Sequence, residues 1–456
     1  MPCTWTDGVQ PQTGDVLAVT DSLSSRGARA AASPLRIDYD ALRETERDRY
    51  HPTENAQGKI PLNIAKNRLS WPDLRAKIES IASSESIPDW VPSYTAAGGA
   101  PAFRKALAHF MGTHLTGCSI EPDEVVVSPG ATGVIEMTAF VLAEEGDVAV
   151  IPAPCYPVYT KDLGNFSQIE RYDLVTHHEI SEIADGPLLT VDDLERAWKD
   201  ITDSGRRFRL LILTSPDNPT GGIYSVERLN RIADWCIAHH VHLIVNEIYG
   251  LSIIDTAHPD ISDDYVSKVE FSSFGQVMKA RQSEYLHLWY SLSKDLGISG
   301  FRVGILWTLN KRALEAYENL NLTHSLSNYT QWVLSRVLTE DEFIHDFITR
   351  NQQRLTDSYA LAARSFRAMG VPYVPARGSL FLWVDLSEFI DEDSESGEMR
   401  LWREIFDDTG VLLTPGVGFG HSKHGLFRFV YPCVQYDELE VAMVRLASYA
   451  DKRRPG

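Results

Sequence analysis

The sequence LHLWYSLSKDLGISGFRVG occupies residues 286–304 and joins a strand signal to a loop of small and charged residues. Its apolar run, 286–290, is typical of a strand covered on both faces. Lys294 follows between small hydroxyl side chains, and Arg302 comes eight residues later. Such a lysine can hold an aldehyde cofactor as a Schiff base, while hydroxyls and a guanidinium bind a phosphate. A surface lysine in a Ser/Gly-rich loop would give the same local pattern.

Strands and helices alternate before this stretch. Apolar runs predict strands at 124–128, 147–151, 210–213 and 242–245, and 302–307 continues the series. Helical spacing within 134–142 and 226–238 predicts helices between them, and Thr190 with Asp193 forms a capping box for a helix over 191–200. This order indicates an α/β fold with a mostly parallel sheet covered by helices, in which ligands bind at the carboxyl ends of the strands.

The pattern also predicts a division of the chain. Residues 1–58 are polar with little apolar periodicity, and we expect an N-terminal arm or irregular extension there. The alternating pattern indicates a large domain over 93–330. Longer helical stretches and a few late strands favour a smaller α+β domain from 59–92 and 331–456.

Composition excludes several classes of function. The 456 residues carry 43 Lys+Arg against 63 Asp+Glu, a net charge of −20, which disfavours nucleic-acid binding through phosphate neutralisation. Five scattered cysteines without a CxxC pair favour a reducing compartment over a disulfide framework or a zinc site. The chain has no apolar run of membrane-spanning length, and its start lacks the features of a signal peptide. We therefore expect a cytoplasmic protein with no nucleic-acid, membrane or metal partner.

The segment YSLSKDLGISGFRVG resembles the cofactor-lysine motif of fold type I pyridoxal-phosphate enzymes, the aminotransferase class I/II superfamily. It is especially similar to the 1-aminocyclopropane-1-carboxylate (ACC) synthases. Further motifs follow the family's order from about Pro61 onward: YTAAGG (94–99), GATG (130–133), PAPCYP (152–157), SPDNPTG (215–221) and GLFRF (425–429). The resemblance implies a sheet of the seven-stranded type, pyridoxal 5′-phosphate as the cofactor and a small-molecule amino-acid substrate.

The resemblance also implies roles around the cofactor ring. Lys294 and Tyr249 would be the catalytic residues, with Lys294 carrying the cofactor. Asn218 and Tyr249 would donate hydrogen bonds to the cofactor phenolate oxygen, and the ring of Tyr156 would stack on the pyridine. Taken alone, Tyr156 could be an ordinary core tyrosine, and residues 215–221 could be an ordinary turn.

Further roles concern the phosphate and the substrate. By resemblance, the residues that hold the cofactor phosphate are Ala131, Thr132, Ser291 and Arg302. Tyr94 would reach the phosphate of a neighbouring subunit, which implies a homodimer with shared sites. Arg428 would bind the substrate carboxylate, for which a planar guanidinium is suited. A bare glycine turn at 130–133 and a surface arginine at 428 are the plainer alternatives.

The chain departs from the family pattern at two positions. Asn246 stands where the superfamily has an aspartate that pairs with the protonated pyridine nitrogen, and an asparagine cannot stabilise that cation. Natural tuning away from transamination, a re-aimed carboxylate such as Glu247, and an engineered substitution are all open explanations. In Ala65-Lys66-Asn67, a lysine replaces the glutamate that ACC synthases carry, so Ala65 and Lys66 are expected at the substrate site.

The expected reaction begins with an external aldimine of S-adenosylmethionine or a similar γ-substituted amino acid. Removal of the α-proton and γ-elimination, which would release methylthioadenosine, would then lead to cyclisation, γ-replacement or annulation in natural-product biosynthesis. The alternative is an aminotransferase of an amino acid, which Asn246 disfavours. A ligand-sensing regulator would need a basic helix-turn-helix domain, and residues 1–58 lack its pattern.

Overall fold

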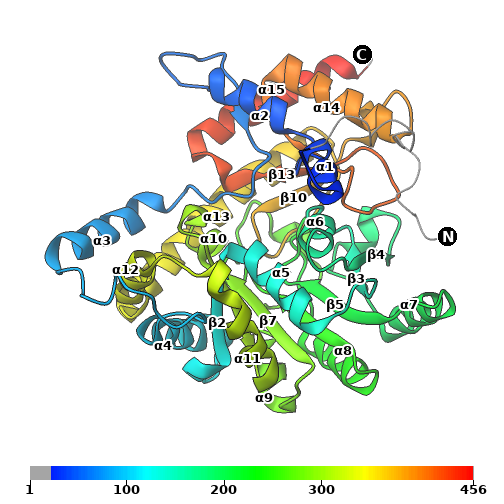
Figure 1. Ribbon diagram of the computed structural model, residues 1–456. Helices are drawn as coiled ribbons and strands as arrows, with labels where there is room; N and C mark the ends of the chain where they lie inside the picture. Colours follow the sequence, from blue (N-terminus) through cyan, green and yellow to red (C-terminus); the bar gives the residue numbers. More distant parts are fainter. Residues whose placement is uncertain (1–21, 455–456) are drawn as a thin grey trace.

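The computed structural model describes residues 22–454, and its largest element is a seven-stranded sheet (Figure 1). The strand order is β2-β8-β7-β6-β5-β3-β4. The bounds are β2 (Val125–Pro129), β3 (Val148–Ala153), β4 (Glu170–Val175), β5 (Phe208–Thr214), β6 (His242–Asn246), β7 (Leu286–Ser291) and β8 (Val303–Thr308). Strand β8 runs antiparallel to β2 and β7, and the other pairs are parallel. The predicted α/β fold with a mostly parallel sheet is confirmed.

Helices cover both faces of this sheet because its strands are apolar on both sides. Along β5, Leu211 and Leu213 belong to one core cluster, and Leu210 and Ile212 belong to another, as the two-residue period of a strand requires. The first face is covered by α4 (Pro101–Phe110), α7 (Val191–Asp203), α8 (Val226–Ala238), α9 (Gly275–Arg281) and α12 (Asn328–Leu338). The second face is covered by α5 (Gly130–Leu142), α6 (Tyr159–Gly164) and α11 (Lys311–Leu320).

A second group of strands and helices comes from the C-terminal part of the chain, joined by the early strand β1. An antiparallel sheet has the order β12-β13-β10-β9, and β1 pairs with β11. The strands are β1 (Ile60–Pro61), β9 (Tyr373–Val374), β10 (Phe381–Asp385), β11 (Val411–Leu412), β12 (Thr414–Pro415) and β13 (Leu426–Val430). The helices are α13 (Asp341–Ala368), α14 (Glu395–Thr409) and α15 (Tyr436–Arg453). These elements share a core of their own.

The predicted domain limits stay a prediction, and packing adds two details. Helix α3 (Trp71–Ser84) lies within the segment assigned to the small domain, but its Leu74 and Ile81 belong to the core of the large sheet. Between residues 22 and 58, where we expected irregular chain, the structure has the helices α1 (Ser25–Ala32) and α2 (Tyr39–Arg47). These helices bury few side chains, so the sequence shows little apolar periodicity there. The rest of the predicted arm, residues 1–21, lies outside the described residues.

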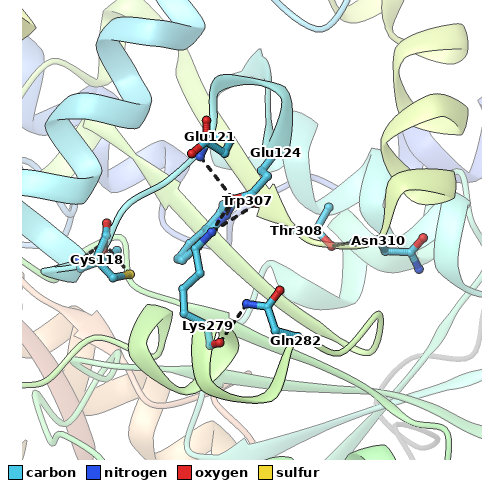
Figure 2. A network of polar contacts seen from close by, with 9 residues as sticks. Cys118, Glu121, Glu124, Lys279, Gln282, Trp307, Thr308 and Asn310 are labelled. Carbon is cyan, nitrogen blue, oxygen red and sulfur yellow. Dashed lines mark hydrogen bonds and ion pairs between the residues drawn. The ribbon is translucent and has the colours of Figure 1, made fainter.

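The two ends of the β2–β8 pair differ in character. At one end, Glu124 accepts hydrogen bonds from Trp307 Nε1 (3.0 Å) and Lys279 Nζ (2.9 Å), as Figure 2 shows. The Lys279 ammonium lies 5.5 Å from the centre of the Trp307 ring. At the other end, Pro129 pairs with Val303 beside the loops described next. Within residues 22–454, no helix combines the length and the apolar character that a membrane crossing requires.

Candidate active site

The predicted site residues follow the strand ends at one edge of the seven-stranded sheet. Parallel strands end at the same edge, so loops that are far apart in sequence meet there. Gly130 follows β2, and Tyr156 comes shortly after β3. Asn218 and Tyr249 follow β5 and β6 in the same way. The start of the antiparallel β8 returns the chain to this edge, where Arg302 precedes it.

Lys294 lies in the short helix α10 (Leu292–Asp295), directly after β7. Its Nζ donates a hydrogen bond to the carbonyl oxygen of Ala65 at 2.7 Å, which joins the predicted residue Ala65 to the site through its backbone. Burial lowers the pKa of Lys294 to about 8, and the positive charges of Arg428, Arg302 and Arg36 act in the same direction. A substantial part of this amine is therefore neutral near physiological pH, as a nucleophile or base must be.

The first turn of α5 and the guanidinium of Arg302 form a cationic cradle. The amides of Ala131 and Thr132 lie in that turn, where a helix offers no carbonyl partner. Arg302 donates from Nη2 to the carbonyl oxygen of Pro129 at 3.0 Å. A Cβ atom at Gly130 would lie only 2.3 Å from Arg302 Nη2 and would displace the guanidinium, and the φ of +79° itself favours glycine at this position. This cradle fits a phosphate group.

Ser291 lies beside the cradle in a buried position. Its Oγ lies 2.6 Å from the carbonyl oxygen of Val303 and 2.8 Å from Ser293 Oγ. Ser293 is also buried, and its amide donates to Ser291 Oγ at 3.2 Å. The hydroxyl of Ser291 thus fixes the start of α10. Ser293, for which the sequence predicted no role, places a second hydroxyl beside that of Ser291.

Three side chains predicted to surround the cofactor ring come together here. Asn218 is buried, and its Oδ1 accepts a hydrogen bond from Arg428 Nη1 at 3.0 Å, so its Nδ2 can donate to a ligand. Tyr249 packs edge-to-face on Phe381, and burial raises the pKa of Tyr249, which keeps its hydroxyl protonated. Burial also raises the pKa of Tyr156, to about 12.

Asn246 is buried at the end of β6 and already holds two partners. Its Nδ2 donates to Tyr159 Oη at 3.0 Å, and its Oδ1 accepts from the amide of Ile248 at 3.2 Å. Glu247 binds Ser273 Oγ and the amide of Phe274, both at 2.6 Å, on the other face of the chain. Glu247 therefore does not take the place of the missing aspartate, and Asn246 itself remains the polar group at this position.

Arg428 is almost fully buried, with 4% of its surface exposed. Its guanidinium lies 4.8 Å from the ring centre of Phe381 and 5.3 Å from that of Phe419. Nη2 donates to the carbonyl oxygen of Asn63 at 3.1 Å, whereas Nε has no partner among the described residues. Burial lowers the pKa of Arg428 to about 10. Among the described residues, no carboxylate forms an ion pair with this buried guanidinium, and its Nε–H has no acceptor, so Arg428 fits the carboxylate of a ligand.

Two predicted residues are exposed, and two unpredicted ones reach the site. Tyr94 is 95% exposed in the loop before α4, and the side chain of Lys66 is also exposed. Arg36 pairs with Asp38, with Nε to Oδ1 at 2.7 Å and a second contact from Nη2 to Oδ2. Asp38 accepts from Asn63 Nδ2 at 2.6 Å. No sequence pattern singled out this pair, because the segment around it lacks apolar periodicity.

Comparisons with known proteins agree with this geometry. Residues 59–446 match the sequence model of the family described as aminotransferase class I and II. Relatives include the 1-aminocyclopropane-1-carboxylate synthase of Glycine max, 29% identical over 92% of this chain and 85% of its own length. Another is 1-aminocyclopropane-1-carboxylate synthase 2 of Arabidopsis thaliana, 29% identical over 91% of this chain and 83% of its own. The aspartate aminotransferase of Thermus thermophilus with maleate shares the fold, with a TM-score of 0.75 at 20% identity over 93% of this chain and 99% of its own. The chain therefore belongs to the aminotransferase class I and II family of pyridoxal-phosphate enzymes, as the resemblance of its lysine motif predicted.

Proposed function

We propose that this enzyme removes the α-proton and the γ-substituent of S-adenosylmethionine or a similar γ-substituted amino acid. The product would then form by cyclisation, γ-replacement or annulation, as a step of natural-product biosynthesis. The observation that carries the proposal is Asn246, a neutral amide bound to Tyr159 at the position of the ring-nitrogen partner. A neutral partner does not stabilise a protonated pyridine, and this disfavours transamination. The ACC synthases among the relatives support chemistry at the γ-carbon.

In the proposed mechanism, bound pyridoxal phosphate supplies an aldehyde for the substrate amine and a ring that accepts electrons. Arg428 binds the α-carboxylate through its free Nε and orients the substrate. Lys294, whose pKa is lowered to about 8, accepts the α-proton at Nζ. Asn218 Nδ2 and the protonated hydroxyl of Tyr249 would donate hydrogen bonds to the phenolate oxygen of the cofactor.

Further residues hold the cofactor in this proposal. The ring of Tyr156 would stack on the pyridine, and Ala131, Thr132, Ser291 and Arg302 would hold the phosphate. We also propose a homodimer with shared sites, supported by Tyr94, whose ring is 95% exposed and free to contact a second subunit. A cytoplasmic location belongs to the same proposal, since five scattered cysteines suit a reducing compartment.

A product assay tests the reaction. The purified holoenzyme is incubated with S-adenosylmethionine, and methylthioadenosine, pyridoxamine phosphate and keto acids are quantified. We expect methylthioadenosine with the wild-type protein and none above background with Lys294→Ala. Stoichiometric pyridoxamine phosphate and a keto acid, formed from single amino acids, would instead identify an aminotransferase.

The substitution Asn246→Asp tests the argument from the ring nitrogen. An aspartate at this position restores a negative charge that stabilises the protonated pyridine. We expect the variant to form pyridoxamine phosphate from amino acids faster than the wild-type protein, by about tenfold for each 1.4 kcal/mol gained. Asn246→Gln, which keeps a neutral amide, serves as the control. An unchanged rate in Asn246→Asp would contradict the role given to Asn246.

A further inference from the structure

The N-terminal segment around Arg36 is fixed on both sides of the active site. On one side, Lys161 of α6 donates from Nζ to the carbonyl oxygen and the hydroxyl of Ser33, both at 2.9 Å. On the other side, Asp38 accepts from Asn63 Nδ2 at 2.6 Å. The carbonyl oxygen of Asn63 is in turn an acceptor of Arg428. The segment therefore crosses from the helices of the large sheet to the neighbourhood of Arg428.

Arg36 is held rigidly but keeps one edge free. Its Nε and Nη2 face the carboxylate of Asp38, and 24% of its side chain is exposed. Among the residues that the structure describes, none accepts a hydrogen bond from its Nη1. A guanidinium has five N–H donors, so the edge turned away from Asp38 can bind a second group. Asp38 thus orients Arg36 without using all of its donors.

The positive charge of Arg36 affects the pKa values of two residues in the site. After burial, it is one of the charges that lower the pKa of Lys294 and the pKa of Arg428, and the hydrogen bonds from Asp38 through Asn63 to Arg428 connect it to the site. In the proposed function, the cofactor phosphate occupies Arg302 and the substrate carboxylate occupies Arg428. Arg36 then remains as a third arginine, and Asp38 is the one carboxylate among the described residues that forms an ion pair with it. Although burial opposes the charge, the hydrogen bond to Asp38 and the charge of Asp38 raise the pKa of Arg36, so its guanidinium stays charged and can attract an anionic group of a ligand.

We propose that Arg36 is a specificity-determining residue that binds an anionic group, a carboxylate or a phosphate, at the far end of the substrate side chain. Of the substrates in the proposed function, this favours a γ-substituted amino acid with an anionic γ-substituent over S-adenosylmethionine, whose γ-sulfur is a cationic sulfonium. This inference rests on the proposed function only for the amino-acid substrate and its contact with Arg428. It does not depend on γ-elimination, so it is tested by binding alone.

The test compares probes that differ in their distal charge. Dissociation constants are measured for the holoenzyme by calorimetry and by the change in cofactor absorbance, with L-glutamate against L-glutamine and O-succinyl-L-homoserine against O-acetyl-L-homoserine. We expect the anionic member of at least one pair to bind more tightly by about tenfold, the lower end of what a charge-assisted hydrogen bond contributes. In Arg36→Ala this preference disappears, whereas the neutral probes bind as before.

Two further variants separate binding from folding. Arg36→Lys keeps the charge and should keep part of the preference even where Arg36→Ala is unstable. Arg43→Ala removes an exposed arginine of the same segment, paired with Asp40 at 2.8 Å, and should change nothing. No preference in either pair, or a preference that survives in Arg36→Ala, overturns the proposal. Equal weakening of neutral and anionic probes also overturns it, because Arg36 would then act only through Asp38 and Asn63 on Arg428.

Discussion

The lowered pKa of Lys294 predicts how the cofactor-free protein takes up pyridoxal phosphate as the pH changes. The neutral amine reacts with the aldehyde, so the rate of covalent binding should rise with pH and level off above the pKa. At about pH 7.5, a pKa of about 8 leaves about 24% of the amine neutral, against about 0.1% for the ordinary value of 10.5. The environment should therefore accelerate binding by roughly 200-fold at this pH.

The measurement is stopped-flow absorbance after the cofactor-free protein is mixed with pyridoxal phosphate between about pH 6 and pH 10. Nα-acetyl-lysine serves as a reference that corrects for the ionisation of the cofactor itself. Arg428→Gln removes a positive charge that lowers the pKa of Lys294, so its profile should shift toward higher pH. Borohydride reduction and peptide mapping identify the lysine that reacts. A wild-type midpoint near 10, or an unshifted midpoint in Arg428→Gln, would refute the reasoning.

Two other substitutions have matched controls. Arg428→Lys keeps the positive charge but loses the planar guanidinium. The loss of one charge-assisted hydrogen bond should lower kcat/KM by about 10- to 150-fold in steady-state kinetics. Arg400→Lys, at an exposed position, is the control and should leave kcat/KM unchanged. Gly130→Ala places a Cβ atom against the guanidinium of the phosphate cradle, and the Kd of the cofactor should rise at least about tenfold in a spectroscopic titration. Gly146 has a similar φ of +80° with open space around it, so Gly146→Ala is the control: it should lower thermal stability without changing the Kd of the cofactor. Equal cofactor affinity in both variants would contradict the proposal that the cradle binds the phosphate.

Local patterns predicted most of the large sheet. The continuous apolar run at 210–213 lies in β5, which is covered on both faces, and the capping box of Thr190 and Asp193 begins α7. Strand β4 was missed because it lies at the edge of the sheet, where ERYDLV is only partly buried and has no regular alternation. The order of short motifs along the chain predicted the carboxyl edge because strand ends in this fold converge there.

The unpredicted parts of the site depend on contacts between distant segments. Asp38 meets Asn63 across 25 residues, and Asn63 meets Arg428 across 365. Asn246 binds Tyr159, 87 residues away, although Tyr159 carried no sequence signal beyond an ordinary aromatic. Such contacts arise from packing, which neither periodicity nor a local motif encodes. The sequence consequently singled out the residues that we propose to bind the cofactor, but not Arg36.

The β2–β8 pair has a polar cluster at one end and the proposed phosphate cradle at the other, and laboratory evolution could vary the two ends separately. The Glu124, Lys279 and Trp307 cluster lies at one end, whereas the residues around 130 and 302 lie at the other, one strand length away. A combinatorial library at the first end would vary the stability of the sheet while the residues of the candidate active site stay unchanged. A library at the second end would instead vary the cradle that we propose for the cofactor phosphate, and so the affinity for the cofactor.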